Sequence, residues 1–236
     1  NAEENVLDDI HFTANPEETV AFIGSTGSGK TTLVNLLPRF FDVTEGAIRF
    51  GDIDIRDVSQ KELRNRIGYV PQKGILFSGT IESNLRYADE NLSDEKMEEA
   101  LTISQAKEFV DRMPNGVNEP IAQGGTNVSG GQKQRLSIAR ALAKDAQVYI
   151  FDDTFSALDY ATDAKLRTAL AGLIAKKHAT VFIVAQRISS IMHADKIIVL
   201  DQGKMAGIGT HEELLKNCEV YQEIAHSQLS REELGE

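Results

Sequence analysis

The stretch Thr19-Val-Ala-Phe-Ile-Gly24-Ser-Thr-Gly-Ser-Gly29-Lys30-Thr31-Thr32 decides the fold of this chain. It opens with a short run of apolar and β-branched side chains, which is typical of a buried strand in a parallel sheet. The segment from Gly24 to Thr31 matches the pattern G-x-x-x-x-G-K-[ST], and a helix is expected from Lys30 onward. In such a loop the glycines let backbone N–H groups turn toward an anion, and the helix adds the positive end of its dipole. The sequence therefore predicts a strand, a phosphate-binding loop and a helix, in that order.

A nucleotide is the expected ligand of this loop. The Lys30 ammonium can reach the β- and γ-phosphates, and the Thr31 hydroxyl can bind Mg²⁺. A glycine-rich turn without a ligand is the alternative, and the strand before the motif and the helix after it argue against that alternative. The loop residues expected to contact the nucleotide are Gly24, Ser25, Thr26, Gly27, Ser28, Gly29, Lys30, Thr31 and Thr32.

A pair of acidic residues ends a second apolar stretch, Val148-Tyr-Ile-Phe151-Asp152-Asp153. An aspartate at the carboxyl end of a strand beside a phosphate loop can hold Mg²⁺, directly or through water. We therefore expect Asp152 to bind the metal. The alternative for both acids is N-capping of a helix near Thr154.

Along the rest of the chain, strand signals alternate with helix signals, which predicts an α/β fold with right-handed crossovers. The predicted strands are Thr19–Ile23, Val148–Phe151, Thr180–Val184 and Lys196–Leu200. The predicted helices include Lys30–Leu37, Gly131–Ala143 and Ala161–Lys177. The middle, from Gly74 to Ala146, has few strand signals and is expected to be a mostly helical insertion. Within it, Asp94–Met113 is predicted to be an amphipathic helix with Ser93 as its N-cap.

The composition excludes several classes of protein. The formal net charge of -11 argues against a nucleic-acid partner, because binding a phosphate backbone requires a basic face. The single cysteine, Cys218, excludes an internal disulfide. The longest apolar runs, such as Val181–Ala185, are strand-sized, whereas a membrane span needs about 18 apolar residues. Any membrane domain is therefore expected to lie outside this chain.

A third motif, Asn127-Val-Ser129-Gly130-Gly131-Gln132, precedes a basic helix that begins Lys133-Gln-Arg135. A serine and two glycines at a helix start form another anion-binding end. Together with the loop and the acid pair, this motif resembles the signature segment of ABC ATPases. The order also matches that family: phosphate loop, Gln72, signature, acid pair, then Ser156-Ala-Leu-Asp159. The resemblance extends over essentially the whole chain.

This resemblance implies a fold and a domain organisation. The fold would be a P-loop NTPase (RecA-like) core with a parallel sheet, an N-terminal antiparallel β subdomain and a helical ABC-specific insertion. The core would comprise residues 1–73 and 147–236 and the insertion about 74–146, all in a single ABC ATP-binding domain. Phe77–Leu85 and Gly209–Leu215 are similar to segments of exporters with fused membrane domains. A transmembrane domain of the same polypeptide is therefore expected, with this domain at the cytoplasmic face of the cell membrane.

The resemblance also implies a partner and roles for individual residues. Two such domains would pair head to tail around two ATP molecules, each ATP lying between one domain's loop and the other's signature. The residues expected to contact the ATP held by the partner domain are Ser129, Gly130, Gly131 and Gln132. Asp159 is also expected among the nucleotide-binding residues, and with Ser156-Ala-Leu it resembles the loop that contacts the opposite domain. For Asp159 a helix cap is the alternative role. Gln72 resembles a hinge glutamine that touches the metal, and the expected Mg²⁺ ligands are Thr31, Gln72 and Asp152.

Two departures from the family pattern fall among the expected catalytic residues, which are Gln72, Asp153 and Gln186. The family usually has a glutamate that polarises the attacking water where this chain has Asp153. The shorter side chain withdraws the carboxylate by about 1 Å, and such a misplacement can cost on the order of 10²-fold in rate. The family usually has a histidine facing the γ-phosphate where this chain has Gln186, which can donate a hydrogen bond but cannot carry the imidazolium charge.

The combined pattern resembles the degenerate-site half of a heterodimeric multidrug- or lipid-type ABC transporter. On this hypothesis the chain's own site hydrolyses ATP poorly, while its signature completes the active site of a non-identical partner. Two alternatives stay open: a homodimeric exporter domain with normal turnover, and the ATPase subunit of an importer. The transported substrate is not predicted, because selectivity lies in the membrane domain.

Overall fold

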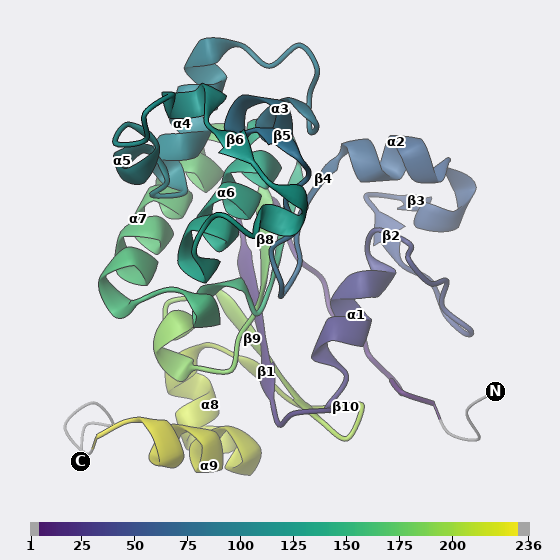
Figure 1. Cartoon of the computed structure of the whole chain (residues 1–236). Helices are drawn as coiled ribbons and strands as arrows, with labels where there is room; N and C mark the ends of the chain where they lie inside the picture. The colour runs from purple at the N-terminus through teal and green to yellow at the C-terminus, as the bar shows by residue number, and fades with distance from the viewer. Residues whose placement is uncertain (1–4, 231–236) are drawn as a thin grey trace. The chain divides into compact units, whose positions relative to one another are not determined.

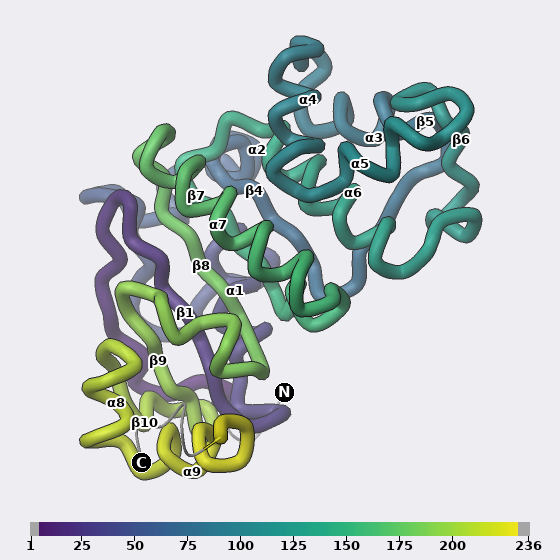
Figure 2. Tube along the Cα trace, turned by 90° about the vertical axis from the view of Figure 1, so that its left-hand side faces the viewer, coloured from purple at the N-terminus to yellow at the C-terminus, as the bar shows by residue number. Residues whose placement is uncertain are grey.

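The computed structural model of this chain describes residues 5–230 and divides into two compact units. Of the described residues, the first unit comprises 5–67 and 180–230, and the second comprises Gly68–Ala179. The first unit therefore contains the phosphate loop, and the second contains the acid pair and the signature motif. Figures 1 and 2 show the two units from directions 90° apart.

The first unit is built on a sheet with the strand order β10-β9-β1-β8. The strands are β1 (Thr19–Gly24), β8 (Thr180–Val184), β9 (Lys196–Asp201) and β10 (Lys204–Gly209). β1 lies between β8 and β9 and is parallel to both, and β10 joins the edge of β9 in the antiparallel direction. The inner strands are buried along almost their whole length, which explains their continuous apolar sequences. The three strands predicted in this unit are thus confirmed, each within one residue at its end.

Helices cover this sheet on both sides. They are α1 (Lys30–Leu36), α8 (His211–Asn217) and α9 (Glu219–Gln228). The unit also contains α2 (Gln60–Asn65) and short 3₁₀ turns at Ile55–Asp57 and Ile188–Ser190. The two views show α1 on one side of the strands, with α8 and α9 on the other (Figures 1 and 2). Within residues 5–67 the antiparallel pairing is limited to a small hairpin, β2 (Arg49–Phe50) with β3 (Ile53–Asp54). Of the expected N-terminal antiparallel β subdomain, the described residues contain only this hairpin.

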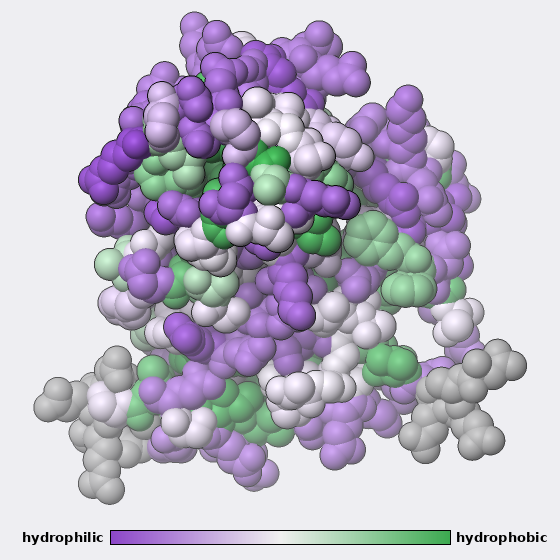
Figure 3. All heavy atoms as spheres, in the orientation of Figure 1, coloured by the Kyte–Doolittle hydropathy of each residue, from purple (hydrophilic) through white to green (hydrophobic). Residues whose placement is uncertain are grey.

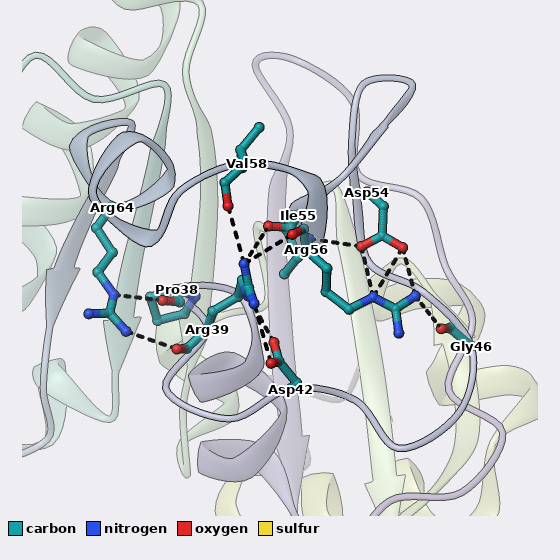
Figure 4. A network of polar contacts seen from close by, with 9 residues as sticks. All are labelled: Pro38, Arg39, Asp42, Gly46, Asp54, Ile55, Arg56, Val58 and Arg64. Atoms are coloured by element: carbon teal, nitrogen blue, oxygen red, sulfur yellow. Dashed lines mark hydrogen bonds and ion pairs between the residues drawn. The ribbon is translucent and has the colours of Figure 1, made fainter.

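A network of arginines ties the end of α1 to the segment that follows the hairpin (Figure 4). The Arg39 guanidinium donates to the carbonyl oxygens of Ile55 and Val58 at 3.1 and 3.2 Å. From α2, Arg64 donates in turn to the carbonyl oxygens of Pro38 and Arg39 at 2.9 and 2.8 Å. The Arg64 bonds satisfy carbonyl groups just beyond the last turn of α1, and the Arg39 bonds join that segment to residues 55–58. Together they fix the direction in which the chain leaves the helix.

The second unit is mostly helical. It contains α3 (Ile81–Arg86), α4 (Asp94–Ile103), α5 (Lys107–Val110), α6 (Gly130–Ala143) and α7 (Tyr160–Lys177). α6 packs against both α3 and α4. Two neighbouring strands, β4 (Ile67–Val70) and β7 (Val148–Asp152), carry the candidate site residues of this unit, and a short hairpin pairs β5 (Gly79–Thr80) with β6 (Pro120–Ile121). The predictions for β7, α6 and α7 are confirmed, with ends that differ by one residue.

The prediction of one helix over Asp94–Met113 is wrong, because α4 ends at Ile103. Gln105 takes the left-handed conformation with φ 59°. The N–H of Ala106 donates to the carbonyl of Leu101 at 2.8 Å, and that of Gln105 donates to Thr102 at 3.1 Å. This pair of bonds is a Schellman motif, which closes the carbonyl end of a helix. The apolar spacing continues past Gln105, and spacing alone does not reveal such a stop when the left-handed residue is not glycine.

The side chains on the face shown in Figure 3 are mainly hydrophilic, with hydrophobic residues in small groups between them. Large apolar side chains that are exposed in the first unit include Phe40, Phe41 and Ile53, and those in the second include Ile75, Phe77, Tyr87 and Tyr160. Among residues 5–230, no helix combines the length and the apolar content that crossing a membrane requires.

The Schellman stop at Gln105 gives a stability prediction. Replacing Gln105→Gly should raise the free energy of unfolding by up to about 1 kcal/mol, because glycine adopts a left-handed conformation without the steric cost of a β-carbon. Urea denaturation measures the change. Ala171→Gly, in the interior of α7, is the matched control and should lower stability by about 1 kcal/mol. Equal losses in both variants would contradict the assignment of Gln105 as the helix stop.

Candidate functional site

The phosphate loop runs from the end of β1 to the start of α1, as the sequence predicts. Lys30 is almost buried, with 8% of its surface exposed, and its ammonium group lies inside the curve of the loop. Nζ donates to the carbonyl oxygens of Gly24 and Ser25 at 2.8 and 2.7 Å, and to Ser28 Oγ at 3.3 Å. These hydrogen bonds therefore stabilise the curved loop, and the lysine places a positive charge at its centre.

Two glycines of the loop are required by its geometry. A β-carbon on Gly24 would lie 2.0 Å from the carbonyl oxygen of Leu200 on β9, which is a backbone atom that cannot move aside. Gly29, directly before α1, has φ 99°, a value that residues with a β-carbon rarely adopt. The backbone of the loop can pass this close to β9 and take a positive φ before α1 only because Gly24 and Gly29 have no side chain.

The remaining predicted residues of the first unit lie at the same edge of the sheet. Thr31 and Thr32 are in the first turn of α1, with Thr31 exposed. Gln186 follows β8, whose parallel pairing with β1 brings the carboxyl ends of the two strands to one edge. The Gln186 carbonyl accepts a hydrogen bond from Gln228 Nε2 at 2.8 Å, and Gln228 Oε1 accepts one from the N–H of Ile188 at 2.9 Å. Gln228 on α9 thus fixes the turn that carries Gln186, a role for which the sequence offers no signal.

In the second unit the acid pair lies at the end of β7. Asp152 is its last residue and is buried, as is Asp153, which has a left-handed backbone with φ 46°. Asp153 stands before a 3₁₀ turn, yet its side chain makes no capping hydrogen bond to that turn. N-capping near Thr154, the alternative considered from the sequence, is therefore not what the Asp153 carboxylate does.

Both acids have partners from β4 and the loop that follows it. Tyr69 Oη donates to Asp152 Oδ2 at 3.4 Å, which is long for a hydrogen bond, and Gln72 Nε2 donates to Asp153 Oδ2 at 2.9 Å. Burial raises the pKa of the Tyr69 hydroxyl, and the neighbouring Asp152 carboxylate raises it further. The phenol therefore stays protonated at neutral pH and remains a donor. Sequence reasoning found Gln72 but missed Tyr69.

The donor set of the second unit fits Mg²⁺. Hard cations prefer oxygen ligands, and Mg²⁺ is usually held by one or two carboxylates while water and substrate phosphates complete its shell. Asp152 supplies a carboxylate, and the Gln72 amide, whose NH₂ group is bonded to Asp153, supplies a carbonyl oxygen. The described residues contain no group of three or more His, Cys, Asp or Glu side chains that could hold a metal ion.

The signature motif forms the start of α6. Ser129 is the N-cap: its Oγ accepts from the N–H of Gln132 at 3.2 Å, and Gln132 Oε1 accepts from the N–H of Ser129 at 3.0 Å. This reciprocal pair is a capping box. Ser129 and Gly130 are exposed at this end, and a β-carbon on Gly130 would meet no atom within 4 Å. The helix start is thus capped and open, as an anion-binding end requires.

Asp159 is the N-cap of α7. Its carboxylate accepts from the N–H and the hydroxyl of Thr162 at 2.9 and 2.7 Å, and these hydrogen bonds lower the pKa of Asp159. The capping role considered from the sequence is therefore present. The side chain is exposed, so capping does not bury it.

The structure thus groups the predicted residues by unit. In the first unit, residues 24–32 and Gln186 lie at one sheet edge. In the second, Gln72 contacts Asp153, while the signature and Asp159 begin two separate helices.

The close approach at Gly24 can be tested by substitution. Gly24→Ala should lower the free energy of unfolding by about 2 kcal/mol or more, since overpacking against a backbone atom forces the strand or the loop to shift. Gly27→Ala is the control, because its β-carbon would meet no atom within 4 Å and adds only the cost of φ 85°. Chemical denaturation compares the two, and a Gly24→Ala protein as stable as Gly27→Ala would contradict the loop geometry.

Comparisons with known proteins give consistent results. A family model described as ABC transporter matches residues 7–156. An uncharacterized ABC transporter ATP-binding protein of Mycobacterium tuberculosis is 49% identical over 226 residues, which are 94% of this chain and 38% of that protein. An ATP-dependent lipid A-core flippase of Desulfotalea psychrophila is 41% identical over 225 residues, which are 95% of this chain and 39% of that protein.

A solved structure, that of a bacterial Atm1-family ABC exporter with ATP bound, superimposes with a TM-score of 0.92 at 34% sequence identity. The match covers 98% of this chain and 40% of the exporter chain. The present chain therefore spans about two fifths of the length of the proteins it matches.

Proposed function

We propose that this chain, which belongs to the ABC transporter family, is the ATP-binding and ATP-hydrolysing domain of an exporter. The observation that carries the proposal is the phosphate loop, in which the buried Lys30 ammonium is held at the centre of a glycine-dependent backbone turn. Such a loop concentrates positive charge and N–H donors where a triphosphate binds.

The proposed roles of the individual residues follow from their chemistry. Residues 24–32 bind the phosphates of ATP, with Lys30 on the β- and γ-phosphates. Thr31, Gln72 and Asp152 bind Mg²⁺, which neutralises charge on the phosphates when bound. Gln186 donates a hydrogen bond toward the γ-phosphate. These assignments are supported by the position of residues 24–32 and Gln186 at one sheet edge, and by the oxygen-rich acid pair.

A second ABC domain and a membrane domain are the proposed partners. The open, capped start of α6 suits an anion presented by another molecule, which supports a head-to-tail pair in which Ser129–Gln132 contact the ATP of the partner domain. Asp159 takes part in the same contact. The names of the relatives, a flippase and an exporter, and the part of their length that this chain does not match both support a transmembrane domain in the same polypeptide. The domain would then act at the cytoplasmic face of the membrane.

The chain's own site is proposed to be the impaired one of a heterodimer. Asp153 is short, buried and hydrogen-bonded to Gln72, so its carboxylate is poorly placed to reach an attacking water. Gln186 adds no positive charge. The intact signature would complete the competent site of a non-identical partner. A homodimeric exporter with normal turnover and an importer ATPase subunit are the competing functions.

Restoring both family residues tests the impaired-site proposal. The double variant Asp153→Glu with Gln186→His should hydrolyse ATP at least about tenfold faster than the unmodified chain, because the carboxylate regains its reach. Single-turnover hydrolysis is the measurement, and Lys30→Ala in the same background shows that the gain belongs to this chain's own loop. An unchanged rate would favour the homodimeric exporter instead.

A further inference from the structure

The contact between Gln72 and Asp153 defines the orientation of a primary amide. Gln72 Nε2 donates to Asp153 Oδ2 at 2.9 Å, which is an ordinary length for a strong hydrogen bond to a carboxylate. An amide has a donor end and an acceptor end, and a carboxylate can only accept. The contact therefore commits the NH₂ group of Gln72 to Asp153 and leaves Oε1 as the end available to a cation.

We propose that Asp153 is a positioning residue in this chain, one that holds the Gln72 amide with its carbonyl oxygen toward Mg²⁺, rather than a base that acts on water. This inference rests on the proposed function, since it assigns a role within the same ATP site. Groups that orient a metal ligand in this way commonly affect metal affinity by about 10- to 100-fold.

The backbone around Asp153 suits this role. Asp153 has φ 46°, and aspartate and asparagine tolerate the left-handed region better than other residues with a β-carbon. Its carbonyl accepts from Ser156 Oγ at 2.8 Å, and the next residue, Thr154, is fully buried and donates to the carbonyl of Val70 at 3.3 Å. The Asp153 carboxylate is therefore presented from a fixed backbone, which is what an orienting group needs.

The length of the Asp153 side chain also supports a positioning role. A glutamate at this position would carry its carboxylate one methylene farther from this fixed backbone. The aspartate ends where the Gln72 amide meets it, with 5% of the residue exposed. The short acid that is poorly placed as a base is thus well placed as a hydrogen-bond acceptor for the metal ligand.

The test measures metal affinity with Mn²⁺ as the probe, bound to the chain with saturating ATP and followed by the loss of the free-ion electron paramagnetic resonance signal. Asp153→Gly removes the acceptor and leaves a residue that adopts φ 46° without strain, so Mn²⁺ affinity should fall by about tenfold or more. Asp153→Asn keeps an oxygen that accepts from Gln72, and should restore the affinity to within about threefold of the unmodified chain.

Two further variants make the result specific. Asp9→Gly is the matched control, because Asp9 also has a left-handed backbone, with φ 51°, but is exposed and distant in sequence from the acid pair. It should leave Mn²⁺ affinity unchanged. In a double-mutant cycle, Gln72→Ala added to Asp153→Gly should cause little additional loss, because both changes remove the same oriented ligand.

The outcomes separate this inference from the proposed function. If Mg-ATP does not bind to the unmodified chain, the proposed function fails. If ATP binds but Asp153→Gly leaves Mn²⁺ affinity unchanged, only the positioning role is overturned. It is equally overturned if Asp153→Asn loses as much affinity as Asp153→Gly, since Asp153 would then act through its charge, as a direct ligand does.

Discussion

The buried ammonium group of Lys30 is the interaction on which the rest of the first unit depends. Its hydrogen bonds to the carbonyl oxygens of Gly24 and Ser25 curl the loop around a positive charge. That curl requires glycine at the points where β1 meets β9 and where α1 begins. The parallel neighbours of β1 then bring Gln186 to the same edge, and the arginine network beyond α1 fixes the far end of the helix. The strands and helices of this unit therefore position the phosphate loop around the Lys30 ammonium group.

In the second unit, hydrogen bonds likewise hold buried charged groups in place, but these groups are negative. Two buried carboxylates at the end of β7 face donors from β4 and its following loop, so two adjacent strands determine where the acids point. The signature start of α6 is built separately, by a capping box that leaves the helix end open. The positive charge of the loop and the negative charge of the acid pair are therefore positioned by different local hydrogen bonds.

The sequence predicted the buried strands and long helices well, because continuous apolar runs and capping residues are local signals. Ser129 and Asp159 cap helices that begin one residue before the starts predicted from the sequence. It failed at Gln105, where a left-handed glutamine ends α4 although the apolar spacing continues. The contacts of Tyr69 with Asp152, and of Gln228 with the turn at Gln186, were also missed. They join residues 83 and 42 positions apart, and only tertiary structure brings such pairs together.

The most direct test of this account is calorimetric titration of Mg-ATP into the chain and into its Lys30→Ala variant. A saturable heat of association for the unmodified chain, and its loss in the variant, is the result that the loop geometry predicts. Titration curves that are flat for both proteins, or the same for both, would show that the buried ammonium does not serve to bind a nucleotide.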